Sequence, residues 1–298
     1  MNLKELSSPI RIYWDIGAAQ QPDFPDERRI AEEIAVNKIL SLQLTESTPV
    51  LSRSCLAILD SLKDTTIAIS LVASIEALDS QALRLIQGLP VRSIFVSTSS
   101  QDDLSSVADI VRQTGGKPAI GVSLPVTRAN FHKLPDILMS CINQKIVNFV
   151  LPMQRLIGDE ECFSLSSEER QELTARLSGF DVPVGMKIII HDPFLWRAFY
   201  PSTQFPDGGC QAANTMLYIS PEAEIYPCPT LPFKLGNLSN KSLKNIIHST
   251  VKKELRKALI SSPKACLNCS ELNQCMGGCR GRAYKVKKSL LQPDPACN

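Results

Sequence analysis

The sequence lacks any hydrophobic run long enough to cross a membrane. Across its 298 residues, no stretch approaches the roughly 18 consecutive apolar residues that a spanning helix requires. The first residues, Met1-Asn-Leu-Lys-Glu, also lack the apolar stretch and the small-residue cleavage site of a secretory signal. We therefore expect a cytoplasmic protein with no membrane partner.

Two kinds of binding motif are missing as well. No glycine-rich nucleotide fingerprint follows a predicted strand; Gly115-Gly116 comes before one, which is typical of a helix cap and turn. Basic residues are not interleaved with the aromatic or groove-reading residues that bind nucleic acids. The sequence therefore predicts no nucleic-acid partner.

The composition is that of an ordinary folded protein. Hydrophobic residues make up 44% of the chain and charged residues 21%, so the chain can bury a full core. The length is sufficient for one large domain and one small domain. We place the large domain at residues 1–200 and the small one at residues 201–298.

Apolar runs alternate with segments of helical periodicity over residues 9–191. The predicted strands span residues 9–16, 39–45, 66–72, 92–98, 118–124, 146–152 and 184–191. The predicted helices between them span residues 27–37, 52–62, 78–87, 101–114, 130–142 and 167–178. Strands separated by single helices imply a mostly parallel sheet, either doubly wound or closed into a barrel. Seven strands favour an α/β fold of the open, partial TIM-like barrel type, with ligand chemistry at the carboxyl ends of the strands.

Cysteines are concentrated near the carboxyl end of the chain, where four of them form the pattern C-x2-C-x5-C-x3-C. Seven of the ten lie between positions 210 and 297: Cys210, Cys228, Cys266, Cys269, Cys275, Cys279 and Cys297. Thiolates two or three residues apart suit a tetrahedral metal or an iron–sulfur cluster, because a tight turn points both sulfurs inward. Disulfides are rare in a reducing compartment, so ten cysteines favour metal or redox chemistry.

The cysteine-rich part is also the basic part. From residue 210 onward there are thirteen Lys and Arg against five Asp and Glu, a net charge of +8, which leaves −6 for residues 1–209. Neighbouring cations favour thiolates and offset the negative charge of a cluster. One basic run is instead typical of the solvated face of a helix: Lys252, Lys253, Arg256 and Lys257.

Zinc is the alternative to an iron–sulfur cluster, because C-x2-C pairs also build structural zinc ribbons. The x5 and x3 spacings do not repeat a two-knuckle pattern, and seven cysteines match neither four nor eight ligands. These features, together with the preceding barrel, favour iron–sulfur chemistry.

The whole order of motifs resembles the radical S-adenosylmethionine (SAM) enzymes that carry a SPASM domain. The resemblance covers nearly the whole chain: the first strand, the partial barrel, Ile188-Ile-Ile-His191-Asp192-Pro193, and then the seven cysteines. The stretches Ile225-Tyr-Pro-Cys228 and Leu235-Gly-Asn-Leu238 resemble the hairpin and exit turn of that domain. One departure is Ala223, where the family usually has glycine.

The family's catalytic cluster motif is absent. In radical SAM enzymes the loop after the first strand holds a C-x3-C-x2-C triad with one open iron, whereas here the loop Gly17–Pro25 contains no cysteine. The Gly-Gly-Glu-Pro motif that approaches the cofactor amine is replaced by Thr45-Glu46-Ser47-Thr48-Pro49. The resemblance therefore implies a pseudoenzyme with no catalytic residue and no residue that binds S-adenosylmethionine for cleavage.

The three remaining cysteines form no triad. Cys55 and Cys141 lie on apolar helical faces, where a lone cysteine acts as a small core residue. Cys162 lies among Glu and Ser before a predicted helix, and nothing in the sequence pairs with it.

The chain thus resembles the SPASM-domain protein of GeoRSP-type systems. That resemblance implies two partners: a radical SAM/SPASM enzyme, and a ribosomally made peptide or a small peptide-binding protein. We expect a non-catalytic iron–sulfur protein that transfers electrons or assists assembly during peptide maturation. The alternative is a peptide-binding module in which clusters or zinc only brace the fold. A weaker hypothesis is an enzyme that uses an open cluster iron as a Lewis acid.

The cysteines are expected to hold two clusters, both [4Fe–4S] or one of them [2Fe–2S]. Cys266, Cys269 and Cys275 can wrap one cluster, and the resemblance implies that Cys297 supplies its fourth ligand. The other cluster would take three further cysteines: Cys210, Cys228 and Cys279. Its fourth ligand is left to water, a partner or substrate group, Asp207 or His191. A strand-end His-Asp-Pro is also a plausible turn in which Asp192 caps backbone amides.

Anaerobically purified protein should be brown, with iron and acid-labile sulfide equivalent to two clusters, because paired thiolates retain such clusters. Metal analysis and a sulfide assay check this. Stoichiometric zinc without sulfide is the result that would contradict it.

Overall fold

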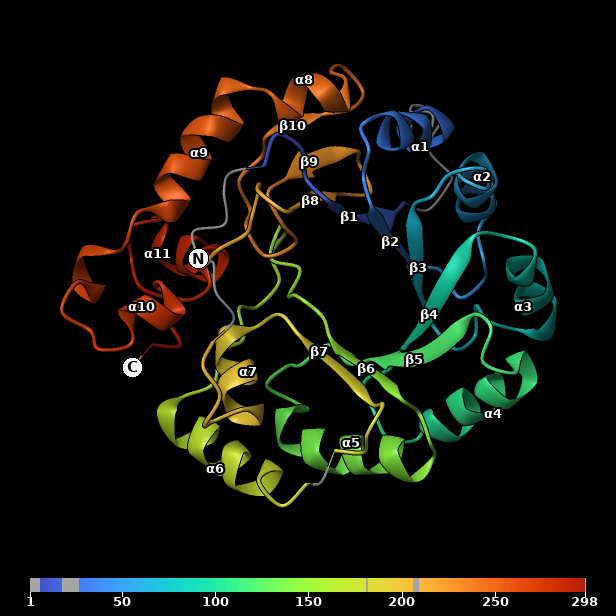
Figure 1. Ribbon diagram of the computed structural model, residues 1–298, viewed down its shortest axis with the longest axis horizontal. Coiled ribbons are helices and arrows are strands. Elements are labelled where there is room, and N and C mark those ends of the chain that lie inside the picture. Colours follow the sequence, from blue (N-terminus) through green and yellow to red (C-terminus); the bar gives the residue numbers. More distant parts are fainter. Residues whose placement is uncertain (1–5, 18–26, 181, 206–208, 298) are drawn as a thin grey trace.

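The computed structural model describes residues 6–17, 27–180, 182–205 and 209–297 (Figure 1). Seven strands occupy the first two thirds of the chain: β1 (Arg11–Ile16), β2 (Ser41–Glu46), β3 (Ala68–Ala73), β4 (Val91–Ser97), β5 (Ala119–Ser123), β6 (Asn148–Leu151) and β7 (Lys187–Ile190). Helices lie between and after them: α1 (Glu27–Val36), α2 (Arg53–Ser61), α3 (Ser80–Gln87), α4 (Leu104–Thr114), α5 (Leu134–Asn143), α6 (Ser167–Leu177) and α7 (Pro193–Phe199). A short 3-10 turn, η1 (Phe131–Lys133), precedes α5.

Strands β1 to β7 pair in parallel and in sequence order. The strands surround a common centre and the helices lie outside them (Figure 1). The predicted alternation and the parallel α/β sheet are therefore confirmed. Among the described strands β7 pairs only with β6, so the barrel is partial and its open side faces the carboxyl-terminal segment.

Helix ends follow from local sequence. Ser52 and Asp79 accept backbone N–H groups at the starts of α2 and α3, and Ser166 forms a capping box with Glu169 at α6. Gly115 ends α4 in the left-handed conformation, which confirms the predicted helix cap.

Alternate residues of β1 face different surroundings. Ile12, Trp14 and Ile16 belong to the main hydrophobic core under the helices. Tyr13 instead packs with Tyr218 of a later strand. The same core contains the Cys55 and Cys141 side chains, both fully buried, as expected for small core residues; burial raises the pKa of Cys141 to about 12.

The carboxyl-terminal segment extends the same sheet. Strand β8 (Met216–Ile219) pairs in parallel with β1, β9 (Glu224–Tyr226) pairs antiparallel with β8, and β10 (Gly236–Asn237) pairs with β9. The remaining elements are α8 (Leu243–Ile247), α9 (Thr250–Ile260), η2 (Lys264–Cys266), α10 (Leu272–Cys275) and α11 (Arg280–Lys287). The expected boundary at residues 200/201 stays a prediction, and the sheet continues across it.

Two residues of the basic run on α9 are buried. The side chains of Lys252 and Arg256 are each only 6% exposed, so a solvated helix face is wrong for both. The Nη1 group of Arg256 donates to the carbonyl oxygens of Cys210 (2.8 Å) and Ala212 (2.9 Å). These buried carbonyls need donors, and α9 supplies one.

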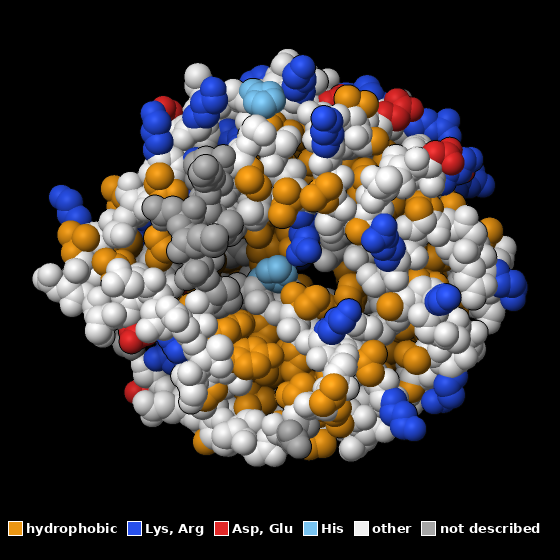
Figure 2. Space-filling view, viewed as in Figure 1, with side chains coloured by type: hydrophobic (Ala, Val, Ile, Leu, Met, Phe, Trp, Pro, Cys, Tyr) orange, Lys and Arg blue, Asp and Glu red, His pale blue; other side chains and the backbone are white. Residues whose placement is uncertain are grey.

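Figure 2 shows one face of the molecule, hollowed near its centre, with hydrophobic side chains around the hollow. Lys and Arg side chains are more numerous than Asp and Glu on this face. None of the helices in the described ranges has the length and apolar character required to span a bilayer.

Ala223 lies in the turn between β8 and β9 with a φ of 57°. Its N–H donates to Ser220 and its carbonyl accepts from Leu238, both at 2.9 Å, so the turn holds this conformation. A left-handed backbone costs a residue with a Cβ about 1–2 kcal/mol. The turn therefore has the geometry that glycine favours, and alanine occupies it under strain.

We expect Ala223→Gly to change the free energy of unfolding by less than about 1 kcal/mol. Relief of strain offsets the loss of a buried methyl, about 0.8 kcal/mol, and the gain in unfolded-chain entropy, about 0.4–1 kcal/mol. Ala31→Gly in α1, equally buried but helical, should cost about 2 kcal/mol. Urea denaturation followed by circular dichroism compares the two; equal losses would contradict strain at Ala223.

Candidate metal centres

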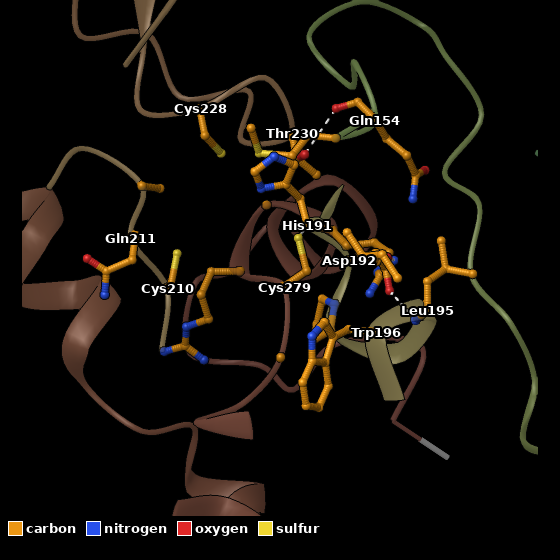
Figure 3. Close-up of a pocket in the computed structure, with 18 of the residues that line it drawn as sticks. Gln154, His191, Asp192, Leu195, Trp196, Cys210, Gln211, Cys228, Thr230 and Cys279 are labelled. Carbon is orange, nitrogen blue, oxygen red and sulfur yellow. Dashed lines mark hydrogen bonds and ion pairs between the residues drawn. The ribbon is translucent and has the colours of Figure 1, made fainter. Parts of the chain in front are cut away.

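A cavity of about 340 Å³ lies between the carboxyl end of β7, helix α7 and the cysteine-rich segment. Four cysteines contribute to its wall: Cys210, Cys228, Cys275 and Cys279. Figure 3 shows Cys210, Cys228 and Cys279 around a common space, with His191 in the same close-up. The cavity therefore joins the carboxyl edge of the barrel to the cysteine array.

Cys210, Cys228 and Cys279, here called the first cysteine group, come from three separate segments. Cys210 precedes β8, Cys228 follows β9, and Cys279 directly precedes α11. Burial and then the charge of Cys210 raise the pKa of Cys228 to about 12. Burial raises the pKa of Cys279, and Cys228 contributes to the rise. The three thiols thus lie within electrostatic range of one another.

Cys266, Cys269, Cys275 and Cys297, here called the second cysteine group, lie nearer the surface. Cys266 is buried and Cys275 half-buried, whereas Cys269 and Cys297 are exposed. Burial raises the pKa of Cys266, and so do Cys275 and Cys269. The pKa of Cys297 is raised by burial and by the other three members of the group. These four thiols therefore lie within electrostatic range of one another.

A sharp turn separates the two groups. Met276, Gly277 and Gly278, the three residues between Cys275 and Cys279, all have a positive φ, of 48°, 91° and 72°. A Cβ at Gly278 would lie 2.6 Å from the Cβ of Asp294, so glycine is required for this close approach. The turn places two neighbouring cysteines in different groups.

A buried ion network anchors this turn to the barrel. The guanidinium of Arg282 binds both carboxylate oxygens of Asp294 (2.7 Å each) and also contacts Asp192. Asp294 accepts the Cys279 N–H at 2.6 Å. Asp192 accepts the N–H groups of residues 194 and 195, which confirms its predicted capping role. The position of Cys279 is thus fixed relative to β7 and α7.

His191 lines the same cavity as the first cysteine group. Its Nε2 lies 3.4 Å from the Tyr13 hydroxyl. Burial raises the pKa of Tyr13, and the charge of Cys228 adds a small part of this rise. Burial, followed by the charges of Arg11 and Arg155, lowers the pKa of His191 to about 4. The imidazole is therefore neutral near pH 7, which is the form that binds metals. Its role as a ligand stays a prediction, and Asp207, the other candidate, lies outside the described residues.

A polar network that the sequence did not reveal crosses the carboxyl end of the barrel. Arg155, after β6, binds both carboxylate oxygens of Asp15 (2.8 and 2.9 Å), and Tyr218 donates to Asp15 at 2.9 Å. Burial opposes ionisation of Asp15, but these bonds outweigh it and hold its pKa below the ordinary value. The alternation of Tyr13 and Asp15 with apolar residues in β1 was the available signal for a polar inner face.

The donor set fits iron–sulfur clusters. Thiolates are soft ligands, and the side chain of Arg280 between them is fully buried with two guanidinium atoms, Nε and Nη1, that have no partner among the described residues. A buried cation with free N–H groups suits an anionic cluster that offers sulfur acceptors. Within the described ranges, no three His, Cys, Asp or Glu side chains are arranged to hold a single metal ion. Cluster ligands are spaced differently, because each thiolate binds a different iron.

Comparison with known proteins identifies the carboxyl-terminal segment. Residues 210–270 match the SPASM family, described as an iron–sulfur cluster-binding domain. The matched span contains Cys210, Cys228, Cys266 and Cys269; the other three cysteines of the array follow it.

Solved structures share the fold of nearly the whole chain. Streptococcus suis SuiB bound to the precursor peptide SuiA has a TM-score of 0.70 at 16% identity, covering 99% of this chain and 77% of SuiB. SuiB bound to S-adenosylmethionine gives 0.68 at 15% identity, over 99% and 78%. The protein anSMEcpe with AdoMet and the Cp18Cys peptide gives 0.65 at 14% identity, over 96% and 94%. The chain therefore shares its fold with SuiB and anSMEcpe, and its residues 210–270 match the iron–sulfur cluster-binding SPASM domain.

Proposed function

We propose that this protein is a cytoplasmic, non-catalytic iron–sulfur partner of a radical SAM peptide-modifying enzyme. Its clusters pass electrons to or from that enzyme, or its SPASM domain assists assembly of the complex with a peptide. Two solved structures that share the fold contain peptides, SuiA and Cp18Cys, which supports a peptide-related role. The protein does not cleave S-adenosylmethionine in this proposal.

One observation carries the proposal: the cysteines form two groups at the SPASM end, and the chain has no C-x3-C-x2-C triad after β1. The three cysteines outside the two groups cannot replace it, because Cys55 and Cys141 are core residues and Cys162 stands alone in sequence. In the family that the chain resembles, three thiolates of one loop hold the cluster with the open iron. The catalytic cluster of the family therefore has no ligands here.

Contacts at the carboxyl ends of β1 and β2 support the same conclusion. The Glu46 carboxylate accepts the N–H of Thr48 (3.1 Å), its hydroxyl (2.8 Å) and the N–H of Ser52 (3.0 Å). The segment that replaces the cofactor-amine motif is thus engaged with itself. Beside it, Asp15 and Arg155 form their ion pair across the barrel mouth. Internal partners hold polar groups where a barrel enzyme would contact its ligand.

The exposure of the two cysteine groups supports a relay. The second group includes the exposed Cys269 and Cys297, whereas the first group lines the internal cavity. Electron transfer between proteins needs one cluster close to the surface, and the second group offers that position.

The alternative role, a peptide-binding module with structural clusters, is favoured by the apolar cavity wall formed by Leu195, Trp196 and Phe205.

The reconstituted protein, reduced with dithionite and supplied with S-adenosylmethionine, should give no 5′-deoxyadenosine above the background of a cluster-free control. The reason is that the chain lacks the C-x3-C-x2-C triad after β1, which in the family it resembles holds the cluster that binds and cleaves the cofactor. Chromatography of the quenched reaction measures the product, and turnover by the purified protein alone would overturn the pseudoenzyme assignment.

A second arm of this experiment separates the two roles. Protein reduced and then freed of dithionite is mixed with the radical SAM enzyme encoded nearest to it, S-adenosylmethionine and peptide. Return of the oxidised absorbance together with 5′-deoxyadenosine formation supports electron transfer. Clusters that stay reduced while the peptide binds tightly support the binding module instead.

The first group is proposed to hold one cluster, with His191 or Asp207 as candidates for its fourth ligand, and the second group to hold the other. Cys279→Ala should therefore remove the cluster bound by Cys210 and Cys228 and leave the other intact. Cys297→Ala is the matched variant and should do the reverse. EPR and Mössbauer spectra distinguish the clusters. If Cys279→Ala and Cys275→Ala lose the same cluster, the crossed division is wrong.

A further inference from the structure

Arg280 occupies an unusual place in the cysteine array. It is the first residue of α11, directly after Cys279, and its side chain is 0% exposed. It lines the cavity together with Cys210, Cys228, Cys275 and Cys279, members of both cysteine groups. A cation at the boundary of the two groups is thus enclosed by the protein.

The guanidinium of Arg280 is only partly bonded. Its Nη2 donates to the carbonyl oxygen of Ser261, whereas Nε and Nη1 have no partner in the described part of the chain. Leaving charged N–H groups buried and unpaired costs several times the net gain from one hydrogen bond. The two atoms are therefore available to acceptors outside the described part of the chain.

The side chain is held in place around those free atoms. A Cβ at Gly277 would lie 2.9 Å from Nη1 and 2.8 Å from Pro263, so a side chain at this position would displace the guanidinium. The neighbouring Arg282 is different, because Asp294 and Asp192 already bind its guanidinium. Of these two buried arginines, Arg280 is the one whose donors stay available.

The guanidinium of Arg280 interacts electrostatically with cysteines of both groups. Its partners are Cys210 and Cys279 of the first group and Cys266 of the second. Arg256, on α9, acts on Cys210 and donates to its carbonyl oxygen. Arg280 therefore lies between the groups, whereas Arg256 lies beside the first.

We propose that Arg280 is a shared donor to the two clusters, with its free Nε and Nη1 groups hydrogen-bonded to their sulfurs, so that one cation sets the reduction potentials of both. This inference rests on the proposed function, because it requires that both groups hold clusters. Each cluster gains one negative charge when it takes up one electron. A nearby cation and N–H···S bonds stabilise that reduced form and raise the potential.

The test is a potentiometric titration, followed by EPR, of three variants of the full-length reconstituted protein. Arg280→Met removes charge and donors and should shift both midpoint potentials to more negative values. Arg280→Lys keeps the charge but loses the planar fork, so both shifts should be smaller. Arg256→Met is the matched control, with its shift confined to the cluster of the first group.

A shift of only one cluster in Arg280→Met, or no shift, would overturn the shared role. If the unsubstituted protein binds no clusters, the proposed function is contradicted instead. Failure of the shared role and failure of the proposed function are therefore distinguishable. If Arg280→Met fails to retain clusters, the unsubstituted protein labelled with guanidino-¹⁵N arginine gives the answer by pulsed EPR. An arginine ¹⁵N coupling at each selectively reduced cluster supports the proposal, and coupling at one or neither contradicts it.

Discussion

Burial of converging thiols, reinforced by repulsion between their thiolates, is the constraint on which the cysteine-rich segment of the structure depends. Burial raises the pKa of Cys228, Cys266 and Cys297, and the charges of neighbouring cysteines raise it further. Metal binding resolves this conflict, because it takes thiolates as ligands and couples their deprotonation to folding. The basic character of the segment and the buried Arg280 and Arg256 provide further compensation.

The barrel positions this array. Strand β8 is hydrogen-bonded to β1, so the SPASM segment continues the barrel sheet, and the array comes to lie on the open side beyond β7. The Asp192–Arg282–Asp294 network then ties the turn before α11 to the end of β7. Breaking one partner of such a buried network leaves an uncompensated charge, which is strongly destabilising. Barrel and cysteine array are thus held in one relative position.

The carboxyl edge of the barrel carries polar groups that are paired with one another. Glu46 is bonded to its own loop, and Asp15 to Arg155 and Tyr218. These groups would otherwise be available to a ligand. Internal pairing satisfies these polar groups within the protein itself.

The sequence by itself determined the alternating strands and helices of residues 9–191 and their parallel order, and it supplied the two-group arrangement of the cysteines as a hypothesis. Local periodicity carries the first two, whereas the division of the cysteines came from the short spacings around Cys266 together with the resemblance to SPASM domains. Only the tertiary structure decided which distant charges meet. Arg155 binds Asp15, which lies 140 residues earlier in the sequence. Arg280 is buried although its sequence neighbours are polar and basic. Such contacts depend on how strands and loops converge in space, and no local pattern encodes that convergence.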